Sequence, residues 1–225
     1  MAEKKEEKKE FDPLYFVQDK EEVNWSILEE GSLLLMLSSI LSALLCFLAV
    51  LFPGPASSAE TSFWAEPQIV YNKENSLSRI DAGLSGSITE SIGYYAFGNV
   101  LSNGYRQIYG GPNWKPFSFL EVGVGVGLES IQPAFRRNAY FQITGEKASL
   151  FGTFEQGGSG PYHKIVLNYQ ATEQLGVGLE EEAFFGRGPR FTYAINKKAT
   201  LFVTRCQWEC EGDTKSVKLG AAFSF

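Results

Sequence analysis

Residues Phe119–Glu129 read FLEVGVGVGLE, and they alternate between two kinds of side chain. Leucine or valine occupies every second position from Leu120 to Leu128, and glycine or glutamate occupies the positions between them. A helix would distribute the valines around its whole circumference, so the pattern predicts a β-strand. A sheet with lipid on one side and a polar interior on the other accounts for both faces of this strand.

The last eight residues, Lys218–Phe225, read KLGAAFSF and alternate in the same way. They resemble the C-terminal β-signal of bacterial outer-membrane barrel proteins, which combines a polar residue, a glycine, an apolar residue and a terminal aromatic. The residues at these four positions are Lys218, Gly220, Phe223 and Phe225. The resemblance implies a porin-like barrel surrounded by outer-membrane lipid and inserted by the barrel-assembly machinery.

Similar alternating runs, separated by polar or glycine-rich breaks, fill the chain from residue 60 onward. They predict an all-β fold, a single antiparallel transmembrane β-barrel of about 12 strands. The predicted strands are Phe63–Tyr71, Arg79–Ile88, Ile92–Val100, Tyr105–Trp114, Phe119–Glu129, Asn138–Thr144, Ser149–Glu155, Tyr162–Gln170, Leu175–Ala183, Arg190–Ile195, Thr200–Trp208 and Ser216–Phe225.

The breaks between the strands support this count. Every second break is short, and such breaks are predicted to lie on the periplasmic rim: Thr89-Glu90, Lys115-Pro116, Gly145–Lys147, Ala171–Glu173 and Asn196–Lys198. The alternate breaks, including Gln132–Arg136 and Gly186–Gly188, then lie on the outer rim. Tyr105–Trp114 is the weakest strand because it contains glycines and a proline, so barrels of 10 or 8 strands are the alternatives.

The first sixty residues have a different composition. Residues 1–32 form a charged leader that we expect to be disordered, and Leu33–Phe52 is an apolar run long enough for one membrane-spanning helix. Ser57 and Ala59 fit a signal-peptidase site before Glu60, so we interpret residues 33–59 as a signal-peptide-like helix and cleavage site, with the barrel at 60–225. A retained anchor is the alternative, because Glu29 and Glu30 stand where a signal peptide has basic residues.

Composition restricts the partners. The formal net charge of −6 leaves no basic excess for nucleic acid, and no residue pattern indicates a cofactor or metal. Glycine and aromatic residues are abundant, as in barrels that need tight turns and aromatic girdles. The oligomeric state is left open.

The faces opposite the apolar residues are predicted to line the lumen. The residues selected are Glu66, Arg79, Asp81, Gln107, Glu121, Glu155, Lys164, Asn168, Glu180, Glu182, Arg190 and Lys218. In a narrow barrel these side chains pair and plug the interior, whereas in a wider one they line a water-filled path. The many inward glycines leave room and favour the path.

His163 is the single histidine, and Ser159 lies close to it in sequence. Outer-membrane lipid-modifying enzymes use a serine–histidine–acid arrangement, but no serine-centred motif accompanies these residues. We therefore interpret His163 as a rim residue at the level of the lipid headgroups, and we expect no enzymatic activity.

Two further clusters lie near the predicted outer rim. Cys206 and Cys210 are predicted to form a disulfide, because the periplasm is oxidising and no other Cys or His completes a metal motif. Glu180–Glu182 is an acidic cluster that we expect to pair with Arg187 and Arg190, and a cation site is the alternative.

Taken together, these patterns predict an exported outer-membrane β-barrel that serves as a small porin-like channel for ions or small solutes. A non-conducting structural or interaction barrel is the alternative, and a lipid-modifying barrel enzyme is the third possibility.

Overall fold

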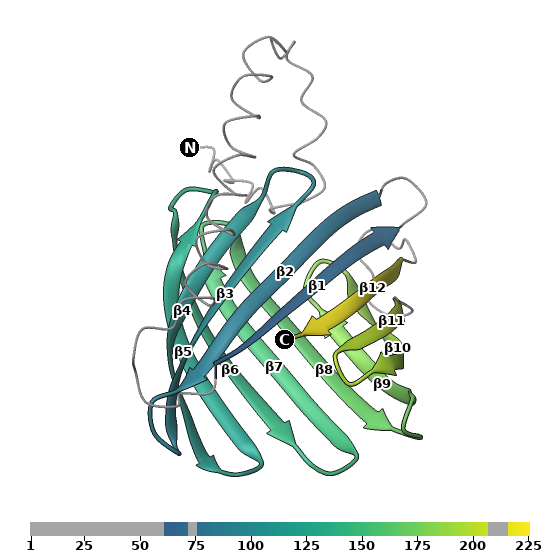
Figure 1. The fold of residues 1–225 in the computed structure, drawn as a ribbon. Helices are drawn as coiled ribbons and strands as arrows, with labels where there is room; N and C mark the ends of the chain where they lie inside the picture. The colour runs from purple at the N-terminus through teal and green to yellow at the C-terminus, as the bar shows by residue number, and fades with distance from the viewer. Residues whose placement is uncertain (1–60, 72–75, 207–215) are drawn as a thin grey trace, which may run out of the picture. The chain divides into compact units, whose positions relative to one another are not determined.

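The computed structural model describes residues 61–71, 76–206 and 216–225, which form a closed antiparallel barrel of twelve strands (Figure 1). Each strand pairs with its neighbours in sequence, and β1 closes the ring against β12. The strands are β1 (Thr61–Tyr71), β2 (Ser76–Ser87), β3 (Ile92–Leu101), β4 (Arg106–Phe117), β5 (Leu120–Glu129), β6 (Phe135–Thr144), β7 (Ala148–Gly157), β8 (Gly160–Gln170), β9 (Leu175–Glu182), β10 (Gly186–Asn196), β11 (Ala199–Arg205) and β12 (Val217–Ser224).

The predicted strand count of twelve is confirmed, and Arg106–Phe117 is one of the strands despite its glycines and prolines. The seam between the first and last strands is continuous. Gln68 pairs with Gly220, and Val70 pairs with Lys218. At the end of the chain, the Phe225 amide donates to the Phe63 carbonyl at 2.8 Å. The barrel therefore has no unpaired sheet edge along this seam.

The two rims of the barrel differ in their connections. We call the rim that carries the β1–β2, β3–β4, β5–β6, β7–β8, β9–β10 and β11–β12 connections the loop rim. The opposite rim carries the remaining connections, together with the start of β1 and the end of β12, and we call it the turn rim. This division matches the two sets of breaks predicted from the sequence.

Apolar side chains cover the outer surface of the barrel. In β5, Val124, Val126 and Leu128 are 59%, 60% and 59% exposed, while Gly123 and Glu129 on the other face are buried. The same alternation exposes Ile80, Ile108, Leu179 and Phe191 on other strands. A continuous apolar exterior of this kind is unfavourable in water and suits a lipid environment.

Two of the turns predicted from the sequence are misplaced, because the residues assigned to them lie inside strands. The break expected at Lys115-Pro116 lies inside β4, where the pairing with β5 shifts between Trp114 and Phe117. A proline has no amide hydrogen to donate, and a register shift is one of the few places in a sheet that accommodates it. The break expected at Gly186–Gly188 lies inside β10, and the chain turns just before it, where Phe184 has a φ of 71°.

Several sequence predictions concern residues outside the described part of the chain. The charged leader at 1–32, the apolar helix and cleavage site at 33–59, and Cys210 all lie there. Among the residues that the structure describes, no helix has the length and apolar character needed to cross a membrane.

Candidate functional site in the barrel interior

The structure places all twelve residues selected from the sequence on the inner face of the barrel. Most are buried, and they come from nine of the twelve strands. Their positions follow from the strand period, because each lies an even number of residues from another inward side chain of its strand. The residues are Glu66, Arg79, Asp81, Gln107, Glu121, Glu155, Lys164, Asn168, Glu180, Glu182, Arg190 and Lys218.

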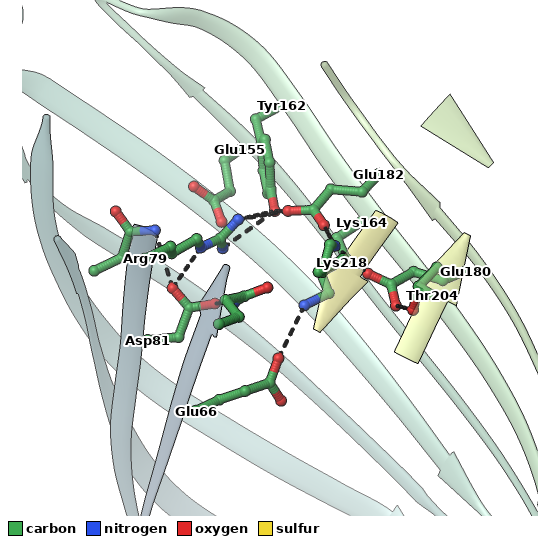
Figure 2. A network of polar contacts seen from close by, with 12 residues as sticks. Glu66, Arg79, Asp81, Glu155, Tyr162, Lys164, Glu180, Glu182, Thr204 and Lys218 are labelled. Atoms are coloured by element: carbon green, nitrogen blue, oxygen red, sulfur yellow. Dashed lines mark hydrogen bonds and ion pairs between the residues drawn. The ribbon is translucent and has the colours of Figure 1, made fainter. Parts of the chain in front are cut away.

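Glu180 and Glu182 are the centre of an ion-pair network near the loop rim (Figure 2). They are 2% and 1% exposed, and the Lys218 ammonium group contacts both carboxylates. Glu180 also accepts hydrogen bonds from Arg190 Nη1 at 2.5 Å and Thr204 Oγ1 at 2.7 Å. Both carboxylates are therefore surrounded by donors from other strands, which offsets the unfavourable desolvation of buried charge.

Arg79 connects this network across the lumen. Its Nη1 atom donates to Glu182 Oε1 at 2.5 Å, although β2 and β9 are separated in the ring by β1, β12, β11 and β10. Its Nε atom donates to Asp81 Oδ1 at 2.6 Å, and the Tyr162 hydroxyl donates to Glu182 at 2.5 Å. Figure 2 shows Arg79 reaching from one wall towards Glu182 and Tyr162 on the other.

A second group of polar side chains fills the lumen on the other side, between β4 and β8. Arg136 donates to Glu129 and to Glu155, each at 2.7 Å, and these three side chains are at most 2% exposed. Glu155 also accepts from the Tyr109 hydroxyl at 2.9 Å, and Glu129 accepts from the Ser159 hydroxyl at 2.7 Å. The interior near the loop rim is thus filled by paired charges.

The contact between Lys164 and Glu66 is looser. Lys164 Nζ and Glu66 Oε1 are 3.6 Å apart, from β8 and β1, and their side chains are 11% and 15% exposed. Buried polar atoms without a hydrogen-bond partner in the described part of the chain include Gln68 Oε1, Asn99 Oδ1 and Asn168 Oδ1. Because these atoms are buried, an ordered internal water is the partner that would satisfy them.

Inward charge is almost balanced. The described strands turn six basic and seven acidic side chains into the lumen, a net charge of −1. They are Arg79, Lys115, Arg136, Lys164, Arg190 and Lys218, and Glu66, Asp81, Glu121, Glu129, Glu155, Glu180 and Glu182. Lys115 and Glu121 form a separate pair near the turn rim, at 3.1 Å. Balanced charge of this kind gives no strong preference for cations or anions.

The inward glycines do not leave an open path along the wall. A Cβ atom at Gly123 would meet the Tyr140 ring, and one at Gly125 would meet the Tyr95 hydroxyl, which donates to Asn138 at 2.5 Å. Gly83 is covered by Trp64 in the same way. The expectation that these glycines widen the lumen is therefore wrong at these positions, because aromatic rings from neighbouring strands fill the space.

Sequence reasoning missed two central residues. Arg136 was assigned to the Gln132–Arg136 connection, yet it is the second residue of β6. Glu129 was placed on the polar face of its strand but was not selected for the lumen. Asn138 and Tyr140 face inward, and Arg136 lies two residues before Asn138. Extending the alternation by one period towards the N-terminus would therefore have predicted that Arg136 faces the lumen.

The structure does not bring Ser159 and His163 together. The Ser159 hydroxyl contacts Glu129 and Arg136 on the inner side, whereas His163 faces outward and its Nε2 atom is 3.3 Å from Glu181. The serine–histidine hydrogen bond that activates a nucleophile is not formed. Glu181 also lies 3.7 Å from Arg187, so the expected pairing of the acidic cluster with Arg187 and Arg190 is present.

Cys206 is disulfide-bonded and buried. Its expected partner, Cys210, is outside the described residues, and the Cys206–Cys210 pairing stays a prediction. Within the described ranges, no group of three or more His, Cys, Asp or Glu side chains is arranged to hold a metal ion.

No protein-family model matches the sequence, and comparison with curated proteins found no match. Solved structures do share the fold. The KdgM porin superposes with a TM-score of 0.51 at 13% identity, over 72% of this chain and 99% of that chain. The NanC porin gives a TM-score of 0.46 at 10% identity over 71% and 98%, and the Acinetobacter baumannii outer membrane protein Omp33 gives 0.45 at 13% over 74% and 98%. The chain has the closed-barrel fold of outer-membrane porins.

Proposed function

We propose that the protein is a narrow, porin-like channel of the bacterial outer membrane, which passes ions or small polar solutes. The observation that carries this proposal is a closed barrel with an apolar exterior and a charged interior. Only a surface in contact with lipid favours so many exposed leucines, valines and phenylalanines. An interior in contact with water or polar solutes favours inward ionisable groups such as these.

We infer that the proposed path is most restricted at the level of Arg79, Lys164 and Lys218, whose side chains belong to the polar contacts drawn in Figure 2. Most ion pairs here are short and buried, but Lys164 and Glu66 are the more accessible members of the network. We infer that solutes pass beside this pair.

The topology supports an orientation. Both ends of the barrel lie at the turn rim, and in bacterial single-chain barrels the chain ends lie in the periplasm. The loop rim then faces the outside. We propose that residues 33–59 direct export and are removed, and that the barrel-assembly machinery reads Lys218, Gly220, Phe223 and Phe225 during insertion.

Planar-bilayer conductance tests the proposal. The protein would be purified from the outer membrane, and only material whose gel mobility shifts on boiling would be used. Discrete current steps are expected. Charge reversal at Lys164 (Lys164→Glu) should increase cation preference, whereas Lys147→Glu, in the β6–β7 turn, should change it much less. If a barrel that is demonstrably folded gives no current, the proposed channel function is refuted.

One specific observation favours the second candidate, a non-conducting barrel. Glu180, Glu182 and Arg136 are at most 2% exposed, so water does not reach these groups in this conformation. A barrel whose lumen is permanently filled in this way would give no current. The same measurement therefore separates the two candidates.

A further inference from the structure

Charged side chains that face outward from the described strands lie at one end of the barrel. Every charged residue that faces outward from a described strand lies near the loop rim. They are Arg106 (first residue of β4), Arg137 (third of β6), Glu181 (next to last of β9), Arg187 (second of β10) and Arg205 (last of β11). Four arginines against one glutamate give a net charge of +3. We call the four arginines the arginine belt.

The opposite end has a different character. The outward residues nearest the turn rim are apolar or aromatic, and they include Ile92, Phe117, Ile143, Tyr169 and Phe223. The turns themselves carry three acidic and three basic residues, Glu90, Glu146, Glu173, Lys147, Lys197 and Lys198, a net charge of zero. Among the described residues, a net positive charge on the exterior is therefore found at the loop rim and not at the turn rim.

Three members of the belt have no acidic partner in the described part of the chain. The side chains of Arg106, Arg137 and Arg205 are exposed and form no ion pair or hydrogen bond with another described residue. The next outward residue on the same strand is apolar in each case, such as Ile108 beside Arg106 and Val203 beside Arg205. The guanidinium groups thus stand where the apolar exterior ends, which is the level of lipid headgroups.

A pocket lies beside the fourth arginine. It has a volume of about 400 Å³, and His163, Glu181, Phe184, Gly186 and Arg187 are among its lining residues. Arg205 pairs with no residue of β9, but it lies on the strand next to Arg187, and β10 and β11 are hydrogen-bonded neighbours. The pocket therefore offers a concave space with one arginine, Arg187, in its lining, and Arg205 lies on the adjacent strand outside that lining.

Guanidinium groups bind phosphate through two parallel hydrogen bonds, and exposed arginines attract anionic headgroups. We infer that the arginine belt binds the phosphate groups of the phosphorylated glycolipid (lipid A) of the outer leaflet. The choice of the outer leaflet rests on the proposed orientation, which places the loop rim outside. The apolar band below the belt would contact the acyl chains of the same lipid.

The test uses the full chain in detergent and purified lipid A, with binding followed by native mass spectrometry. The variant is Arg106→Gln/Arg137→Gln/Arg205→Gln, which leaves Arg187 and its contact with Glu181 in place. The control is Lys147→Gln/Lys197→Gln/Lys198→Gln, which removes the same charge from the turn rim. Binding by the belt variant should be weaker by roughly tenfold or more, and binding by the control should be unchanged. Gel mobility before and after boiling establishes that each variant is folded.

Equal binding by the belt variant and the native protein would overturn the inference, as would an equal loss in the control variant. Dephosphorylated lipid A should bind the native protein weakly; if it binds as well as the phosphorylated form, the phosphate assignment is wrong. Equal belt-dependent binding of an anionic glycerophospholipid would overturn the choice of glycolipid. Conductance of the belt variant separates this inference from the channel, because the belt faces away from the lumen and the current should not change.

Discussion

Inside the barrel, Arg79, Arg136 and Lys218 each contact two carboxylates from other positions in the wall. A buried ion pair adds little net stability compared with an apolar pair, but removing one partner leaves an uncompensated charge. At the scale of the residue, the interior is therefore sensitive to loss of a single cation.

Arg136→Met tests this sensitivity. It leaves Glu129 and Glu155 buried without their shared cation, and we expect the free energy of unfolding to fall by about 3–5 kcal/mol. Lys115→Met is the matched control, because Lys115 is 49% exposed and its pair with Glu121 should contribute less than about 1 kcal/mol. Urea unfolding in detergent, followed by tryptophan fluorescence, measures both. Equal losses would show that burial of the network does not matter.

The sequence identified which side chains face inward but not which ones meet. Inward placement of Glu180 and Arg190 follows from the period of two, because successive side chains of a strand point to opposite faces of the sheet. The contact between Arg79 and Glu182 depends on the curvature of the whole ring, because their strands are not adjacent. No local pattern records that distance, and the cross-lumen partners therefore could not be predicted.

At the scale of the element, alternation determined the strands well and the turns less well. The strand Leu120–Glu129 ends within one residue of its predicted bounds. The turn near Pro116 was placed too early, because proline marks turns as well as irregular places in strands, and the sequence does not distinguish them. Inward glycines were ambiguous for a similar reason. A glycine can leave free space in the lumen, or it can make room for an aromatic ring from a neighbouring strand.

Substitution of Gly125 distinguishes these two uses of glycine. A Cβ atom there would meet the Tyr95 hydroxyl and lie 3.0 Å from the Gly110 carbonyl oxygen, so Gly125→Ala should destabilise the barrel by about 1–3 kcal/mol. Gly98→Ala, in β3, is the control, because the nearest atom is 3.6 Å from its Cβ position. Urea titration compares the two. If Gly125→Ala is as stable as Gly98→Ala, the rings do not occupy this space.

Phe225→Ala separates the role of the last strand in folding from its role in assembly. The ring of Phe225 lies 5.7 Å from that of Phe63, an exposed contact of modest energy. We expect refolding in detergent to be nearly normal and the amount of protein in outer membranes to fall strongly. Phe191→Ala, on the exposed face of β10, should leave that amount unchanged. A normal yield of Phe225→Ala in the membrane would argue against recognition of the C-terminal aromatic.

At the scale of the whole molecule, the barrel combines an apolar exterior, an interior crossed by ion pairs, and charged exterior residues at one rim. The ion pairs connect strands that are not neighbours in the ring, such as β2 and β9. They therefore oppose both collapse and expansion of the lumen. The sequence indicated the class of the fold through its strand count. It did not indicate whether the lumen is open, because that depends on how the inward side chains pack together.

Removing the looser pair should widen the proposed path. In the double variant Glu66→Ala/Lys164→Ala both charges are lost together, so no unpaired buried ion remains. Single-channel conductance is expected to rise, with no loss of heat-modifiable gel mobility. The double variant Lys115→Ala/Glu121→Ala removes a pair near the turn rim and should have a smaller effect. Unchanged conductance in the first variant would mean that solutes do not pass beside Lys164.

The backbone contact between Phe63 and Phe225 brings the two ends of the barrel together, and this makes the starting point of the chain arbitrary. A circularly permuted chain, with a short linker from Phe225 to Thr61 and new termini in the β6–β7 turn, would keep every strand pair. Its last strand would end at Thr144 instead of a phenylalanine. Such a permutant should refold in detergent, because every strand pair would be intact. In cells it should fail to reach the membrane, because its chain would no longer end in the residues that the assembly machinery is proposed to recognise.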